Sequence, residues 1–159
     1  MAGPSNPPAA CQPSALFLGR RAAGLSNRHC SAPSSVLAGD QRLHVNARHL
    51  VQDELRRGRL FVSSVTYWEL ARLVQLGRVD LGCDLRIWRT RRIDSGIREI
   101  PLDAETLILA EELRQDDAPN DLADRLLMAG AMSRRGRLAT ADREILDWEG
   151  PLERVDVRG

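Results

Sequence analysis

The sequence is poor in cysteine, histidine and aromatic residues, and it contains no lysine. Its three cysteines (Cys11, Cys30 and Cys83) are odd in number and widely spaced, so they predict neither a disulfide framework nor a zinc site and favour a reducing cytoplasm. No apolar run approaches membrane-spanning length, and Ala15–Gly19 is too short for the apolar core of a signal peptide. We therefore expect a cytoplasmic protein that does not bind membranes.

An excess of either charge is also missing. The chain has 23 basic residues, all arginine, and 22 acidic residues, which leaves a net charge of +1. Broad, non-specific coating of nucleic acid is not expected at this balance. The length of 159 residues and the hydrophobic content of 43% suit one domain with its own core.

Residues 1–35 differ from the rest because they contain most of the prolines and no acidic residue. Such a segment buries too little apolar surface to offset its ordering entropy. We predict a disordered or aberrant segment over 1–35 and a folded domain over 36–159. An acid-poor, arginine-containing N-terminus is also typical of organelle transit peptides, but no amphipathic helix is evident here.

From Asp40 onward, short apolar segments alternate with helical periodicity. Helices are predicted at about 42–57 (capped by Asp40), 63–77, 84–95, 104–114 and 121–135, with a brief one after Asp142; strands are predicted at 60–62, 98–102, 137–140 and 153–157. This alternation predicts an α/β fold with a parallel sheet covered on both faces. The three tryptophans are expected in the core: Trp68, Trp88 and Trp148.

Acidic residues follow or precede several of these strands. Glu69 lies in the helix after the first predicted strand, Asp121 and Asp124 open the helix before 137–140, and Asp142 follows that strand. Ligands bind at the carboxyl edge of open α/β sheets, and carboxylates gathered there repel one another unless a cation or proton intervenes. The pattern indicates a divalent-metal site built from oxygen ligands.

Each acid also has a purely structural interpretation. Thr66 and Glu69 fit a capping box, Asp121 and Asp142 are good N-cap residues, and Asp124 in a first turn is favoured by the helix dipole. An α/β domain whose acids are all caps is therefore a further alternative.

These segments resemble the PIN-domain ribonucleases, especially toxins of VapC-type toxin–antitoxin pairs. The matching pieces, in family order over about 37–157, are Val62–Leu70, Leu76–Val79, Ile100–Leu102, Asp121–Leu127 and Leu138–Arg143. Leu122 stands where the family usually has proline. The resemblance implies a three-layer α/β/α fold with a central parallel sheet.

The resemblance also implies an activity, partners and ligands. The activity would be Mg²⁺- or Mn²⁺-dependent hydrolysis of RNA, with Glu69, Asp124 and Asp142 as catalytic, metal-binding acids and Asp121 outside the direct ligands. The implied partners are a cognate antitoxin, an RNA substrate and a second copy of the chain. The alternative is a catalytically impaired PIN-like module that binds antitoxin or RNA without cleaving.

One family feature is missing. PIN proteins begin with an apolar strand that ends in an aspartate, but the corresponding segment here, Ser26–Pro33, has neither an acid nor a strand pattern. We therefore expect the N-terminal strand to be lost or altered. One hypothesis is a shifted reading frame or a wrong gene start upstream of about Ser35.

Overall fold

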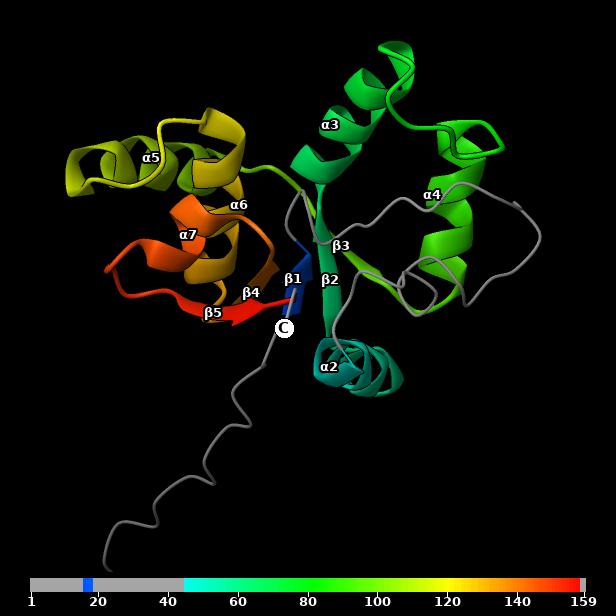
Figure 1. Cartoon of the computed structure of the whole chain (residues 1–159), viewed down its shortest axis with the longest axis horizontal. Coiled ribbons are helices and arrows are strands. Elements are labelled where there is room, and N and C mark those ends of the chain that lie inside the picture. The colour runs from blue at the N-terminus through cyan, green and yellow to red at the C-terminus, as the bar shows by residue number, and fades with distance from the viewer. Residues whose placement is uncertain (1–15, 19–44, 158–159) are drawn as a thin grey trace, which may run out of the picture.

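The computed structural model describes residues 16–18 and 45–157, and its centre is a five-stranded sheet with the order β3-β2-β1-β4-β5. The strands are β1 (Leu16–Leu18), β2 (Leu60–Ser63), β3 (Arg98–Ile100), β4 (Arg137–Thr140) and β5 (Glu153–Asp156). Every neighbouring pair is parallel. Parallel strands require crossover connections, which explains the helices between them (Figure 1).

The strand β1 corrects our expectation for the N-terminal segment. We predicted a disordered or aberrant segment over 1–35 and a first strand lost or altered near residue 28, whereas Leu16–Leu18 forms the middle strand and pairs with both β2 and β4. The remainder of 1–35 and the proposed cap Asp40 lie outside the described residues. The domain boundary at 35/36 stays a prediction.

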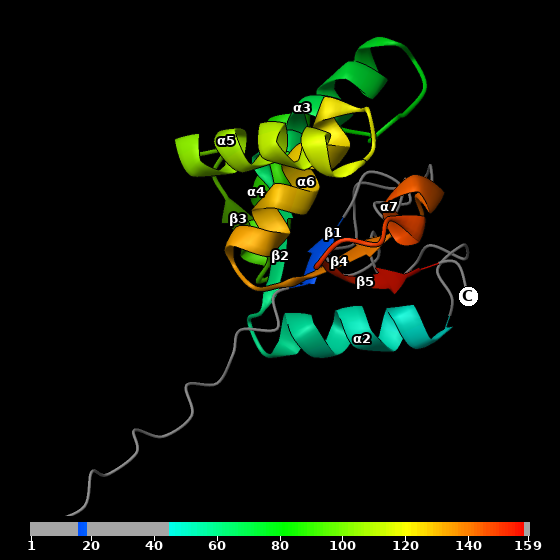
Figure 2. The same ribbon diagram turned by 90° about the vertical axis from the view of Figure 1, so that its left-hand side faces the viewer.

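Helices cover both faces of the sheet, as predicted. On one side lies α2 (Val45–Arg56), and on the other lie α5 (Ala104–Glu112), α6 (Leu122–Ser133) and α7 (Arg143–Asp147) (Figure 2). Both α3 (Ser64–Gln75) and α4 (Leu85–Asp94) lie toward the β2–β3 end of the sheet, and a short 3₁₀ turn, η1 (Leu113–Asp116), joins α5 to the segment before α6.

Strand alternation divides the core into two clusters. Leu138 of β4 packs with α5, α6 and α7, whereas the next residue, Ala139, packs with α2 on the other face. The helix α6 is buried from Ala123 to Ala131 because it lies between the sheet and α5. Trp88 and Trp148 are buried as predicted, but Trp68 is 58% exposed, so its assignment to the core was wrong.

Candidate functional site

The predicted acids lie on elements that meet at the carboxyl edge of the sheet. The helix α3 begins where β2 ends, and Asp142 follows the end of β4. The helix α6 leads into the start of β4, so it begins near the carboxyl edge, and it contacts α3, β1 and β4. Strand order reverses between β1 and β4, and such switch points are where open α/β sheets bind ligands.

Glu69 is a buried residue in the second turn of α3. The N-cap of α3 is Ser63, whose Oγ accepts a hydrogen bond from the Val65 amide at 3.3 Å. Thr66 is therefore inside the helix, and the capping box that we considered for Thr66 and Glu69 does not form. Glu69 as a whole residue is only 7% exposed, which is unusual for an acidic residue.

The start of α6 places two acids in different environments. Asp121 is exposed and caps the helix, with Oδ1 accepting from the Ala123 amide at 2.8 Å. Its structural interpretation as a cap is therefore confirmed. Asp124 lies one turn further on and is 6% exposed. Burial on this scale is found where a carboxylate is paired or binds a metal, and it goes beyond what a favourable helix dipole requires.

Asp142 is held in a turn between β4 and α7. Its Oδ1 accepts from the Glu144 amide at 3.0 Å, so Asp142 is the N-cap of α7, as its structural alternative predicted. Its own amide donates to Oγ1 of Thr140 at 3.0 Å, and Thr140 is only 1% exposed. Sequence reasoning missed Thr140, although a Thr-x-Asp spacing after a strand is a typical signal of such a turn.

The carboxylate oxygens of these acids are the kind of ligand that hard divalent cations such as Mg²⁺ prefer. The Oε2 atom of Glu69 and the Oδ1 atom of Asp124 are buried and make no hydrogen bond, while both side chains have other interactions. Within 16–18 and 45–157, no three His, Cys, Asp or Glu side chains are grouped closely enough to hold a metal ion. Two buried carboxylates are still a normal protein contribution to a Mg²⁺ site, because this ion keeps several waters and uses substrate phosphates as further ligands.

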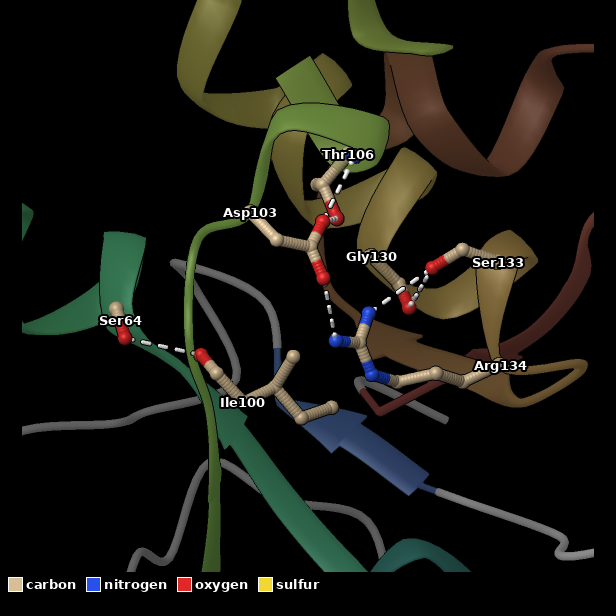
Figure 3. A network of polar contacts seen from close by, with 7 residues as sticks. All are labelled: Ser64, Ile100, Asp103, Thr106, Gly130, Ser133 and Arg134. Atoms are coloured by element: carbon tan, nitrogen blue, oxygen red, sulfur yellow. Dashed lines mark hydrogen bonds and ion pairs between the residues drawn. The ribbon is translucent and has the colours of Figure 1, made fainter. Parts of the chain in front are cut away.

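Polar contacts also join the helices and strands of the domain to one another. Ser64, the first residue of α3, donates to the carbonyl of Ile100 at 2.9 Å and so joins the carboxyl ends of β2 and β3 (Figure 3). Figure 3 also shows Arg134, at the end of α6, reaching Asp103 at the start of α5, with an Nη2–Oδ2 distance of 3.2 Å. Asp103 in turn caps α5 through Thr106.

The strand β1 ends without an acid in the sequence that follows it. Gly19, Arg20 and Arg21 come directly after Leu18, and the first acidic residue of the whole chain is Asp40. An acid following the middle strand is therefore absent, both where we first expected it near residue 28 and after the strand that the structure shows.

The parallel sheet, the covering helices and the acids near its switch point define an α/β domain with an acidic carboxyl edge. The family model for the PIN domain matches residues 31–149. This match covers well over half of the sequence, so the chain belongs to the PIN domain family. Comparison with curated proteins gives no significant match.

Solved structures share the fold at low sequence identity. A toxin–antitoxin complex from Klebsiella pneumoniae is 18% identical with a TM-score of 0.56, over 90% of this chain and 97% of the other. A DNA-bound VapBC complex from Salmonella typhimurium is 16% identical with a TM-score of 0.57, over 89% and 97%. FitAcB from Neisseria gonorrhoeae is 14% identical with a TM-score of 0.57, over 89% and 96%. These likenesses confirm the predicted PIN fold. The part of the chain that the structure describes holds no helix long and apolar enough to cross a membrane.

Proposed function

We propose that this chain is a Mg²⁺- or Mn²⁺-dependent endoribonuclease that acts as the toxin of a toxin–antitoxin pair. The observation that carries the proposal is the burial of Glu69 and Asp124 on two helices in contact, α3 and α6, at the carboxyl edge of the sheet. Membership of the PIN domain family supports a nuclease. One similar structure is described as a toxin–antitoxin complex and another as DNA-bound VapBC, which supports a cognate antitoxin as the partner.

Each acid has a distinct role in this proposal. Glu69 and Asp124 supply buried carboxylate oxygens. Asp142, in the turn that Thr140 shapes, is the third proposed acid, although the described structure does not bring three such side chains close enough to hold a metal ion by themselves. Asp121 is exposed at the start of α6, the helix that carries Asp124, and assists from there. A divalent ion bound there would activate a water molecule and stabilise the charge on the leaving oxygen. Because the described acids form no complete ligand group, a phosphate of the RNA is expected to complete the site.

The near-zero net charge suits a localised RNA site rather than a basic coat over the surface. We extend the proposal to a cytoplasmic location, which the cysteine pattern favours, and to association of two copies, which the family resemblance implies.

The absence of an acid after β1 favours a second candidate function. With one carboxylate fewer, metal affinity and charge stabilisation both weaken, because ligand charge tunes the affinity of such sites. The alternative is a PIN-like module that binds antitoxin or RNA without cleaving it.

Metal titration and cleavage separate the two candidates. The melting temperature of the full chain is measured against Mn²⁺ concentration, with and without a short RNA, and RNA cleavage is followed with Mg²⁺ and Mn²⁺. We expect Mn²⁺ to raise the melting temperature, RNA to strengthen this response, and Glu69→Gln and Asp124→Asn to abolish both the response and the cleavage. Asp53→Asn on α2 is the matched control, because it removes an acid away from the site.

The outcomes are distinct. Cleavage that survives Asp124→Asn, or no Mn²⁺ response at any concentration, contradicts the nuclease proposal. If Mn²⁺ raises the melting temperature but the chain does not cleave RNA, the result supports the alternative, a PIN-like module that does not cleave. Copurification with the product of an adjacent gene tests the antitoxin partner separately.

A further inference from the structure

A buried arginine, Arg125, follows Asp124 in α6. It is 5% exposed and stands in the first turn of a helix whose other residues from Ala123 to Ala131 are mostly apolar. Arginine is almost never buried to this extent unless its charge has partners. Its role is separate from the carboxylates of the proposed site, because a cation cannot be a metal ligand.

The partners of Arg125 are backbone carbonyls on both sides of the α5–α6 connection. Nε donates to the carbonyl of Ala110 at 3.0 Å, and Nη1 donates to the carbonyls of Pro119 at 2.9 Å and Asn120 at 2.7 Å. The carboxylate of Glu111 lies 4.0 Å from Nη2. A positive charge is favoured near the last turn of α5, where helix carbonyls lack intrahelical partners.

One side chain thus joins three pieces of backbone. It holds the end of α5, the two residues directly before the N-cap Asp121, and the first turn of α6. Only the planar guanidinium fork reaches several acceptors in fixed directions. The contacts determine how the segment 119–121 enters α6, and hence where Asp121 and Asp124 stand relative to α3.

We infer that Arg125 is a positioning residue for the acids at the start of α6. It acts through Pro119 and Asn120 and touches neither the metal nor the RNA. The inference rests on the proposed nuclease function, because its readout is metal binding at Glu69 and Asp124. Arg134 provides the contrast, since it ties the same two helices together at their other end, through Asp103 (Figure 3).

The experiment compares full-length Arg125→Met, Arg125→Lys and Arg134→Met with the unmodified chain. For each, the Mn²⁺ dependence of the melting temperature is measured, together with kcat and KM for RNA cleavage at saturating Mn²⁺. Groups that orient metal ligands typically change metal affinity by about 10–100-fold when removed, and we expect a change of this size for Arg125→Met. Saturating Mn²⁺ should restore most of kcat. The Mn²⁺ affinity of Arg125→Lys should lie between those of the unmodified chain and Arg125→Met, because the lysine ammonium keeps the charge but lacks the planar fork of donors. Arg134→Met should leave the Mn²⁺ midpoint unchanged.

The readouts distinguish positioning from simple packing. If Arg125→Met lowers the melting temperature but keeps the Mn²⁺ midpoint of the unmodified chain, Arg125 only stabilises the fold and the inference is wrong. An equal shift of the midpoint in Arg134→Met also overturns it. If Arg125→Met does not fold, Arg125→Lys takes its place: a shifted Mn²⁺ midpoint supports the inference, and an unchanged midpoint contradicts it. If the unmodified chain shows no Mn²⁺ response, the proposed function fails and the inference fails with it. If the unmodified chain responds but the Arg125 variant has the same Mn²⁺ midpoint, only the inference about Arg125 is wrong.

Discussion

Thr140 controls the conformation of the acid that follows it, because its Oγ1 accepts the hydrogen bond of the Asp142 amide at 3.0 Å. The hydroxyl is nearly inaccessible, since Thr140 is 1% exposed at the end of β4. Asp142 uses its own carboxylate to cap α7. The strand end, the turn and the helix start therefore form one hydrogen-bonded unit, and the orientation of Asp142 depends on Thr140.

Replacing Thr140 with valine keeps the side-chain shape but removes this acceptor. We expect Thr140→Val to lower the free energy of unfolding by about 1–2 kcal/mol, because the Asp142 amide loses its partner at a partly buried position. Mn²⁺ affinity and cleavage should fall as well. Thr140→Ser is the control, since it keeps the hydroxyl. Urea unfolding and Mn²⁺ titration check both effects, and equal behaviour of the two variants would contradict this role of the hydroxyl.

Several elements were predictable because their signals are local. Asp103, Asp121 and Asp142 each cap the helix that the sequence pattern assigns to them. In each case the capping side chain bonds an amide only two or three residues away, so nearby sequence carries the information. In α3 the sequence left two caps open, Ser63 at the predicted helix start and Thr66 in a capping box, because several hydroxyl residues follow one another; the structure uses Ser63.

A third buried acid, Glu54, lies at the opposite edge of the sheet from the proposed site. Glu54 is 3% exposed, and its carboxylate accepts two hydrogen bonds from Arg59, at 2.9 and 3.1 Å, with Arg137 at 3.5 Å. It belongs to the last turn of α2, and Arg137 is the first residue of β4, so the group joins the amino ends of these elements. The group is therefore structural.

We expect Glu54→Gln to lower the free energy of unfolding by about 3 kcal/mol, because it leaves two arginines facing a neutral side chain. The neighbouring substitution Asp53→Asn removes an exposed pair with Arg56 and should cost less than about 1 kcal/mol. Urea unfolding measures both. Neither variant should alter the Mn²⁺ midpoint, and a shift in Glu54→Gln would mean that the two sheet edges are coupled.

The N-cap residue of α5, Asp103, makes part of the stability of the fold depend on pH. The Thr106 hydroxyl, followed by the Thr106 amide and Arg134, holds the pKa of Asp103 below the usual value of an aspartate. A lowered pKa in the folded state means that Asp103 contributes stability above its ordinary pKa, and that this contribution is lost as the pH falls through the lowered value. We expect Thr106→Val to raise the pKa of Asp103 more than Arg134→Met does. Carboxyl NMR titration measures both, and the reverse order would show that the ion pair outweighs the hydroxyl.

Other features could not be predicted because they depend on contacts distant in sequence. The strand β1 has only three residues, lies among Pro- and Ser-rich sequence, and is defined by pairing with β2 and β4. Arg125 was overlooked because its acceptors are carbonyls, which leave no side-chain signature. The sequence shows only a charged residue within an apolar helix. This pattern is common to all buried charges with a function, so it does not reveal the role of Arg125.

The corrected position of β1 leads to a gain-of-function prediction. The resemblance to PIN proteins places an aspartate at the end of the first strand, and here Gly19 follows Leu18 directly. Leu18 pairs in register with Ala139 of β4, three residues before Asp142. We expect Gly19→Asp to tighten Mn²⁺ binding and to increase RNA cleavage, because one more carboxylate raises the ligand charge of the site.

The matched control is Gly19→Asn, which adds nearly the same volume without charge and should do neither. Mn²⁺ titration by melting temperature and cleavage at fixed Mn²⁺ measure the effect. Tighter binding in both variants would show that the side-chain volume matters rather than the charge. Weaker binding in Gly19→Asp alone would place residue 19 away from the acids, and the missing ligand would then have to be sought elsewhere in the chain. Tighter binding by Gly19→Asp alone would establish that the lost first-strand acid limits this protein as a nuclease.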